Sequence, residues 1–516
     1  MRYVKITGVK PTDPTEPDAT EPKPTDPKPS EPSEPTDPTE PKPTEPEDVT
    51  ELKIIVEADG FAELEKYVNL KKLDLSGSTC YAEIRAYMEA HPEIEVIYTV
   101  DLGGSTAVNK VTLLELLPDE FTADTLIENL KYLPNVNTLK LRKMELDLTK
   151  VDELIAAYPD IHITYTVDIC GSEVDAEAES AIISTITEAK VEEAVERMNK
   201  VPGLKHVNLM NGSNTSLSMQ GVKTLQTLRP DLELEYTFDF YGKKVSLDTK
   251  EVKIEGRTIG DSGESKIRLA LDIMTGCEYM LLDDCGIDYE ILADIRADYA
   301  GKTKVVWRVE YGTARRPRTA LTDITVLRFV GNEYDNADKL HNADVVNFKY
   351  FNEVKYMDLG HNTTLTNIDF ISYMPKLEMA ILSAVNMTNL NAFANNPSIN
   401  FIEVAWCSNL SDISALATCP SMKYLNIAHT KVTDISSISG VDLELFMLYG
   451  TKVSDAQCDA YMAAHPDVLL TKYKPAGAGS NPEYGYGWRY SNPQCTVKSK
   501  PYSILWDVFD YGSYWG

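Results

Sequence analysis

The sequence lacks the short motifs that mark common cofactor and metal sites. Its eight cysteines are scattered along 516 residues without a C-x-x-C pair, which excludes the usual zinc and dithiol frameworks. It contains no H-E-x-x-H, no G-x-G-x-x-G and no G-x-x-x-x-G-K-S/T, so the standard sites for zinc proteases, dinucleotides and nucleoside triphosphates are missing too. We therefore expect no cofactor and no resident metal ion.

Positive charge and long apolar runs are scarce as well. Subtracting the 80 acidic from the 50 basic residues leaves a net charge of −30, whose field repels nucleic-acid phosphates and anionic lipid headgroups. No apolar run reaches the roughly 18 residues that a membrane span requires. We therefore exclude nucleic acids as partners and membrane insertion within this chain, and we expect a ligand to be neutral or basic.

Proline is concentrated near one end of the chain. Residues 11 to 46 hold 13 of the 28 prolines, with ten acidic residues and three lysines, so this stretch cannot pack into a core. Dense proline favours polyproline II, and like charges extend the chain further. We predict an extended Pro/Thr/Glu-rich linker over residues 11–48. Residues 1–10 alternate apolar and polar side chains, which fits either a remnant of an upstream β domain or a disordered tail.

A template of about 22 residues recurs five times over residues 351–455. Each copy places three apolar residues in the spacing L-x-x-L-x-L, and the third members are Leu359, Leu382, Val404, Ile427 and Leu448. An x-L-x-L-x segment predicts a short strand with alternate side chains pointing inward, and one copy cannot bury its apolar face alone. The pattern therefore predicts a stack of parallel strands.

Two copies, INFIEVAWCSNLSDISALATCP (399–420) and MKYLNIAHTKVTDISSISG (422–440), resemble the leucine-rich repeat family, and its internalin-like short class in particular. The resemblance implies an α/β leucine-rich repeat solenoid, a curved right-handed stack with a parallel sheet on its concave face. It also implies a non-enzymatic, monomeric protein of the Gram-positive bacterial surface or secreted type, and hence an extracellular location. At the position where the family uses Asn or Cys, Asn362 and Cys407 fit the pattern and Thr430 does not.

A longer unit precedes the short repeats and spans residues 49–350. Successive units of about 66 to 77 residues begin at Leu75, Leu141, Leu209 and Leu282. In each, a helix precedes a strand, and glycines after the strand suggest a tight hairpin. We expect divergent leucine-rich repeats that carry hairpin insertions and continue into the short repeats as one stack over residues 49–470. Residues 456–516 are expected to form a C-terminal helix and an aromatic-rich cap.

Two further motifs resemble sites of catalysis or metal binding. Residues 260–263 read GDSG and resemble the nucleophile segment of chymotrypsin-like serine proteases, but that chemistry needs a His base, an Asp partner and an oxyanion pocket. We therefore expect no catalytic residue and no enzyme, with a serine hydrolase at Ser262 as the remote alternative. The acidic loops around Asp283 and Asp335 lack the spacing of a calcium loop, and solvated loops are the preferred interpretation.

The outward strand positions of the short repeats define the predicted binding surface on the concave face. Because adjacent strands lie about 4.8 Å apart, these positions form an apolar and aromatic stripe flanked by polar groups. Soluble monomers seldom expose such a stripe unless a ligand covers it. The predicted ligand-binding residues are Tyr356, Asp358, Met379, Ile381, Phe401, Glu403, Tyr424, Asn426, Leu445, Met447 and Tyr449.

We predict that this stripe recognises a protein or peptide, because aromatic anchors with a polar rim are typical of protein-binding hot spots. Glycan binding and a passive structural stalk are the alternatives. Residues 484–516 hold ten aromatic residues, which would form either a cap over the last repeat or a platform for sugar rings. If this segment instead folds back over the stripe, it buries the predicted site intramolecularly.

Overall fold

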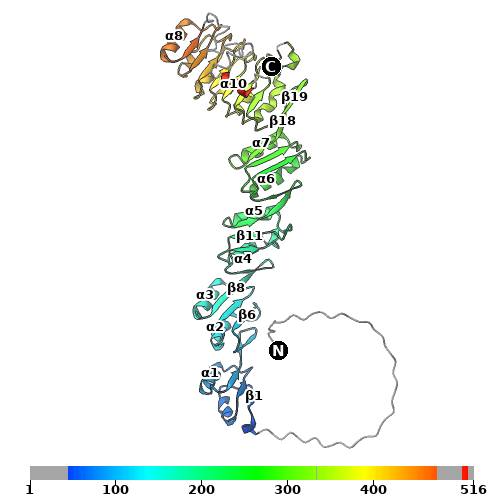
Figure 1. Cartoon of the computed structure of the whole chain (residues 1–516), viewed down its shortest axis with the longest axis vertical. Helices are drawn as coiled ribbons and strands as arrows, with labels where there is room; N and C mark the ends of the chain where they lie inside the picture. Colours follow the sequence, from blue (N-terminus) through cyan, green and yellow to red (C-terminus); the bar gives the residue numbers. More distant parts are fainter. Residues whose placement is uncertain (1–44, 333, 473–501, 510–516) are drawn as a thin grey trace, which may run out of the picture. The chain divides into compact units, whose positions relative to one another are not determined.

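A computed structural model of the chain describes residues 45–332, 334–472 and 502–509 (Figure 1). The predicted strand within residues 1–10 and nearly all of the predicted linker lie outside these ranges, as do most aromatic residues of the C-terminal segment. Among the described residues, no helix is long and apolar enough to cross a membrane.

The chain divides into two compact units, whereas one uninterrupted stack over residues 49–470 was expected. The first unit runs to Leu102 and includes Thr106–Val111 and Asn129–Asn135; nearly all of the rest, including everything from Val136 onward, belongs to the second. The expectation of one stack is therefore wrong. A hairpin insertion interrupts the parallel ladder, and the strand after it starts a new sheet.

The first unit contains a three-stranded parallel sheet in the order β1-β2-β3 and an antiparallel hairpin, β4-β5. Leu73 and Ile84 are fully buried in it. Its elements are η1 (Pro46–Asp48), β1 (Glu51–Lys53), η2 (Gly60–Lys66), β2 (Lys72–Asp74), α1 (Tyr81–Ala90), β3 (Glu95–Ile97), β4 (Thr99–Asp101), β5 (Thr106–Val108) and η3 (Leu130–Tyr132).

Three further long units repeat this plan. In each, three parallel strands are followed by an antiparallel hairpin, which confirms the predicted hairpin insertions. The strands are β6 (Leu113–Leu116), β7 (Thr138–Leu141), β8 (His162–Ile169), β9 (Ser172–Asp175), β10 (Ser180–Ile182), β11 (His206–Asn208), β12 (Glu233–Glu235), β13 (Thr237–Phe240), β14 (Lys243–Ser246), β15 (Glu251–Glu255), β16 (Tyr279–Asp283), β17 (Lys304–Val306), β18 (Arg308–Thr313) and β19 (Arg316–Leu321).

The helices of the long units begin and end where the sequence provides signals for it. The Asp147 side chain caps α3 by accepting from the Thr149 backbone N–H, and Ser218 caps α5 in the same way. Pro159 and Pro230 follow the ends of these helices, where proline cannot continue them. The helices are α2 (Ala123–Asn129), α3 (Leu148–Ala157), η4 (Glu188–Lys190), α4 (Val191–Met198), α5 (Met219–Leu228), η5 (Asp261–Gly263), α6 (Glu264–Ile273) and α7 (Tyr289–Asp298).

The short repeats form a seven-stranded sheet in which all strands are parallel and the spatial order equals the chain order. The sheet starts one strand earlier than the predicted repeats and ends one strand later. Its strands are β20 (Val326–Arg328), β21 (Tyr356–Asp358), β22 (Met379–Ile381), β23 (Phe401–Glu403), β24 (Tyr424–Asn426), β25 (Leu445–Met447) and β26 (Leu469–Thr471).

Short 3-10 helices return the chain from one strand of this sheet to the next, and their apolar residues pack on the inward side chains of the strands. They supply the second apolar set of each repeat, such as Ile438. These helices and the remaining α-helices are η6 (Asn336–Asp338), η7 (Asn342–Tyr350), η8 (Asp369–Tyr373), η9 (Asn391–Phe393), η10 (Ser414–Thr418), η11 (Ser436–Ile438), α8 (Asp455–Ala464) and α10 (Tyr502–Val508).

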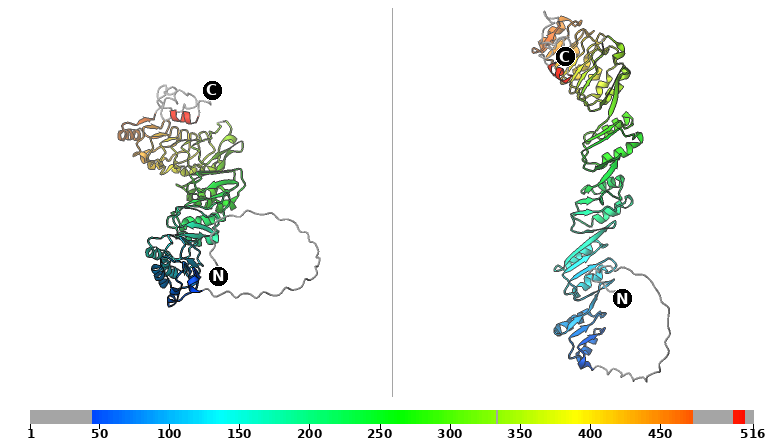
Figure 2. Two further views of the ribbon diagram at one scale, coloured as in Figure 1. Left: turned by 60° about the horizontal axis from the view of Figure 1, so that its bottom comes forward. Right: turned by 45° about the vertical axis from the view of Figure 1, so that its right-hand side comes forward.

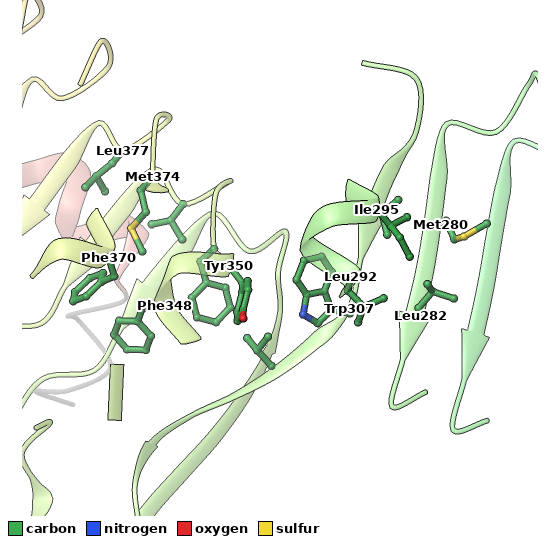
Figure 3. Close-up of a cluster of buried hydrophobic side chains, with 14 of the residues drawn as sticks. Met280, Leu282, Leu292, Ile295, Trp307, Phe348, Tyr350, Phe370, Met374 and Leu377 are labelled. Atoms are coloured by element: carbon green, nitrogen blue, oxygen red, sulfur yellow. The ribbon is translucent and has the colours of Figure 1, made fainter. Parts of the chain in front are cut away.

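One apolar core runs without a break from Val167 to Tyr461, across the change from long to short repeats. Figure 3 shows the junction, where Trp307 at the end of the last long unit faces Tyr350 at the start of the short repeats. Their rings meet edge to face with centroids 5.6 Å apart. The Arg296 guanidinium lies 4.6 Å from the indole ring, so the junction is closed by a cation–π contact as well.

The Asn/Cys position of the repeats ties neighbouring coils together. The Asn362 amide donates to the Phe329 carbonyl of the preceding coil at 2.7 Å and accepts from the Leu340 N–H at 2.8 Å. The Cys407 thiol reaches the preceding Leu382 carbonyl at 3.2 Å, and burial raises its pKa to about 12. Thr430, which departs from the family pattern, donates to a carbonyl of its own coil instead. The ladder between coils is therefore incomplete, as the sequence indicates.

Candidate functional site

The predicted binding residues do lie on one face of the seven-stranded sheet. Strand pairing places Tyr356, Met379, Phe401, Tyr424 and Leu445 side by side on successive strands. The same register aligns a second column two residues further along each strand, made up of Asp358, Ile381, Glu403, Asn426 and Met447. We call this surface the outward face.

The outward face is not an open stripe, however. In the first column Met379, Phe401 and Leu445 are buried, and every residue of the second column is buried too. Tyr356 and Tyr424 are half-buried, as is Tyr449 beyond the strand end. The expectation of an exposed apolar surface is therefore wrong.

The chain itself covers part of this face with helix α10. Leu505 and Phe509 are 0% and 3% exposed, and they form one apolar cluster with Met379, Ile381 and Phe401. Both views of Figure 2 show the red α10 helix against the sheet. The physical reason is that a wide apolar surface costs free energy in water, and the chain holds a matching amphipathic segment.

Helix α10 presents one apolar side to the sheet. Leu505 and Phe509 are four residues apart, so they project from the same side of the helix, and Val508 packs at the edge of the cluster. Ile504 and Asp507 face away and are exposed. The sequence contained this signal, since the spacing i, i+3, i+4 of the three apolar residues predicts an amphipathic turn; these residues were missed as part of the site.

The polar side chains of the outward face form hydrogen bonds with nearby residues. The Glu403 carboxylate accepts from the Ser383 hydroxyl at 2.6 Å. Asp358 and Asn426 each accept from the backbone N–H two residues later, at 3.0 and 3.1 Å. These side chains close the ends of their strands, as Asx turns do.

The two half-buried tyrosines each make a hydrogen bond to an acidic side chain. The Tyr424 hydroxyl donates to Glu444 at 2.7 Å, and burial together with this carboxylate raises the pKa of Tyr424 to about 12. The Tyr356 hydroxyl donates to Glu378 at 3.4 Å. Lys355 also pairs with Glu378 at 3.2 Å, so this carboxylate is neutralised within the chain.

Comparisons with known proteins were made for sequence and for structure. No family model and no curated protein matches the sequence. Similar solved structures include an internalin of Listeria monocytogenes, at 14% identity and a TM-score of 0.27, which covers 76% of this chain and 88% of that one. A leucine-rich repeat protein of Leptospira interrogans has 12% identity and a TM-score of 0.26 over 82% and 96% of the two chains.

A third similar structure is the leucine-rich repeat ectodomain of a plant receptor kinase from Arabidopsis thaliana, at 9% identity and a TM-score of 0.21 over 82% of this chain and 48% of that one. Likenesses this weak carry no argument about function. Strand order, repeat length and the Asn/Cys ladder decide the fold. The fold is an α/β leucine-rich repeat fold.

The leucine-rich repeat scaffold places Ser262 in η5, next to helix α6 and exposed to solvent. Among the described residues, no hydrogen bond joins Ser262 to a histidine. Its neighbour Asp261 accepts from the backbone N–H of Asp288 at 2.8 Å, so this carboxylate ties two loops together. The segment thus has a structural partner, and the absence of enzyme activity stays a prediction.

The acidic loops of the leucine-rich repeats have structural roles too. Asp283 receives two hydrogen bonds of 2.8 Å from the Arg308 guanidinium, and Asp288 caps α7. Asp335 caps η6. Across residues 45–332, 334–472 and 502–509, no group of three or more His, Cys, Asp or Glu side chains is arranged to hold a metal ion.

Proposed function

We propose that this chain is a non-enzymatic, extracellular binding protein whose partner, a protein or peptide, docks on the outward face of the seven-stranded sheet in place of α10. The observation that carries the proposal is the seating of α10 through Leu505 and Phe509 on Met379, Ile381 and Phe401. An amphipathic helix laid into an apolar surface is a recurring mode of peptide recognition. Helix α10 then acts as an internal occupant that a partner displaces.

The energetics favour such an exchange. A seven-residue helix is not stable alone in water, so α10 depends on the sheet for its structure. Each buried apolar side chain contributes about 1.5–3 kcal/mol, and among the described side chains of this segment (504, 505 and 507–509) Leu505, Val508 and Phe509 lie in or against the cluster. A partner with more apolar anchors would therefore outcompete α10.

The same observation distinguishes the proposal from a passive stalk. A stalk gains nothing from apolar residues at outward strand positions, where polar side chains keep a sheet soluble. Here Met379, Phe401 and Leu445 fall in register on one column. The net charge of −30 favours a neutral or basic partner, and a basic partner should associate more slowly at high salt.

The test uses a chain ending at Lys472, which removes α10 and uncovers the face. Helical peptides selected on this chain should bind it more tightly than they bind the full chain, and Phe401→Ala should weaken them. Leu505→Asp in the full chain should reproduce the gain, whereas Ile504→Asp, on the exposed side of the same helix, should not. Ligands that bind both chain lengths and Phe401→Ala equally, at unchanged stability, would place the site elsewhere.

A further inference from the structure

A column of residues beyond the ends of the short-repeat strands adopts the left-handed conformation. Its members are His361, Ala384, Trp406, His429 and Gly450, with φ between +59° and +73°. The backbone N–H of Trp406 donates to the Ala428 carbonyl, and that of His429 donates to the Tyr449 carbonyl, both at 2.8 Å. At these positions the left-handed conformation therefore accompanies a hydrogen bond to the next coil.

Trp406 occupies this column at a cost. The left-handed region is sterically strained for a non-glycine residue, and a bulky one is rare there. Its indole is nevertheless 58% exposed, so burial does not compensate for the strain. Strained residues that the fold holds in place are concentrated at binding and catalytic sites.

The indole is rigidly supported from one side. It stacks on the His429 imidazole with ring centroids 3.8 Å apart and planes 19° from parallel. The edge of Tyr449 meets the same imidazole at 5.0 Å. The imidazole in turn lies against Gly450, where an added Cβ would come within 2.6 Å of Nδ1. Only a glycine at this position leaves room for the stack.

Ala384 occupies the column position of the preceding coil, and its methyl group cannot stack on an indole as His429 does. Trp406 is 58% exposed although His429 covers one face of its ring. Three polar residues, Asn386, Asn409 and Lys431, follow the column positions of their coils by two or three residues and are joined by hydrogen bonds. The Asn409 amide donates to the Asn386 side chain, and its oxygen accepts from Lys431 at 2.8 Å.

We propose that the free face of Trp406 binds the pyranose ring of a neutral saccharide, whose hydroxyls exchange hydrogen bonds with Asn386, Asn409 and Lys431. The C–H face of a pyranose matches the electron-rich face of an indole, and primary amides both donate to and accept from hydroxyls. The Lys431 ammonium disfavours a cationic ligand, although an indole alone would accept one. This site lies beyond the strand ends, next to Tyr449, and goes beyond the proposed function.

The experiment titrates the full chain with neutral tetrasaccharides of glucose, mannose and N-acetylglucosamine, and with tetramethylammonium, by saturation-transfer NMR. At least one saccharide should bind at millimolar concentration. Trp406→Ala should lower its affinity about tenfold, and Trp406→Phe should retain part of it. Tyr373→Ala, which removes an equally exposed ring (57%) from the same array, should change nothing.

A second variant tests the open face without removing the indole. Ala384→Trp would stack a ring on that face, in a backbone conformation that Trp406 already tolerates, and should abolish saccharide binding. Unchanged thermal unfolding of each variant verifies the fold. Failure of all three saccharides to bind would overturn the proposal, as would binding of tetramethylammonium alone or equal affinities in Trp406→Ala and Tyr373→Ala. Peptide binding is tested separately through Phe401 and Leu505, which these variants leave unchanged.

Discussion

The Arg328 guanidinium donates a hydrogen bond of 2.9 Å to the backbone carbonyl of Phe509. Arg328 ends β20, the first strand of the seven-stranded sheet, and Phe509 directly follows α10. Carbonyls at the C-terminal end of a helix lack partners within it, and a cation there is stabilising. This bond therefore fixes the end of α10 at the sheet edge, beside the apolar contacts of Leu505 and Phe509.

Arg328→Met should loosen α10 while leaving the repeats folded. A hydrogen bond to a charged group contributes about 1.5–3 kcal/mol, so exchange of the Phe509 amide hydrogen should accelerate about tenfold or more. That amide donates to the Leu505 carbonyl at 3.0 Å and reports on the helix directly. Arg318→Met, at an exposed position of the neighbouring hairpin, is the matched control. Equal exchange in the two variants would show that Arg328 does not hold the helix.

Leu425→Ala should destabilise the short repeats by roughly 2–5 kcal/mol, because it opens a cavity in a continuous core. Asn426→Ala, on the opposite side of the same strand, removes one hydrogen bond to the Ala428 N–H and should cost about 1–2 kcal/mol. Urea unfolding measures both. A larger cost at Asn426 would mean that the strand register is wrong.

Asn362→Ala should cost more than Thr430→Ala, although both residues occupy the same position of the repeat. The Asn362 amide joins two coils through the Phe329 carbonyl and the Leu340 N–H. Its removal leaves these buried backbone groups without their hydrogen bonds to Asn362, so the free energy of unfolding should fall by about 2–4 kcal/mol. Thr430 bonds only within its own coil and should cost about 1 kcal/mol. Equal thermal shifts would contradict the role of Asn362 as a tie between coils.

The stability of the second unit should fall in acid partly through Glu173. Hydrogen bonds from Arg142, together with one from Thr166, lower the pKa of Glu173 from its ordinary 4.5 to about 2. A lowered pKa stabilises the fold above the unfolded value, and this contribution is lost as the pH falls from 4.5 toward 2. In Glu173→Gln the free energy of unfolding should depend less on pH in this window. An identical slope in wild type and variant would exclude the contribution.

The local pattern of apolar and polar residues was sufficient to predict the strands and their register. The alternation around Leu425 and the spacing of the repeats predicted which side chains point inward, because a strand sends successive side chains to opposite faces. The first two hairpin insertions followed from glycines after the strand, Gly103-Gly104 and Gly171. The pattern could not show that the chain divides into two compact units, since this depends on contacts between segments and not on any single segment.

The sequence by itself determined that residues such as Met379 and Phe401 form an apolar column on the outward face of a parallel sheet. Only the tertiary structure decided that Leu505 and Phe509 cover this column, and that Trp406 stays exposed on its stack with His429. The physical reason is that the periodicity of apolar residues indicates which side chains of a strand or helix are shielded from water. What finally excludes the water is settled by contacts between segments distant along the chain, and these leave no trace in the local pattern.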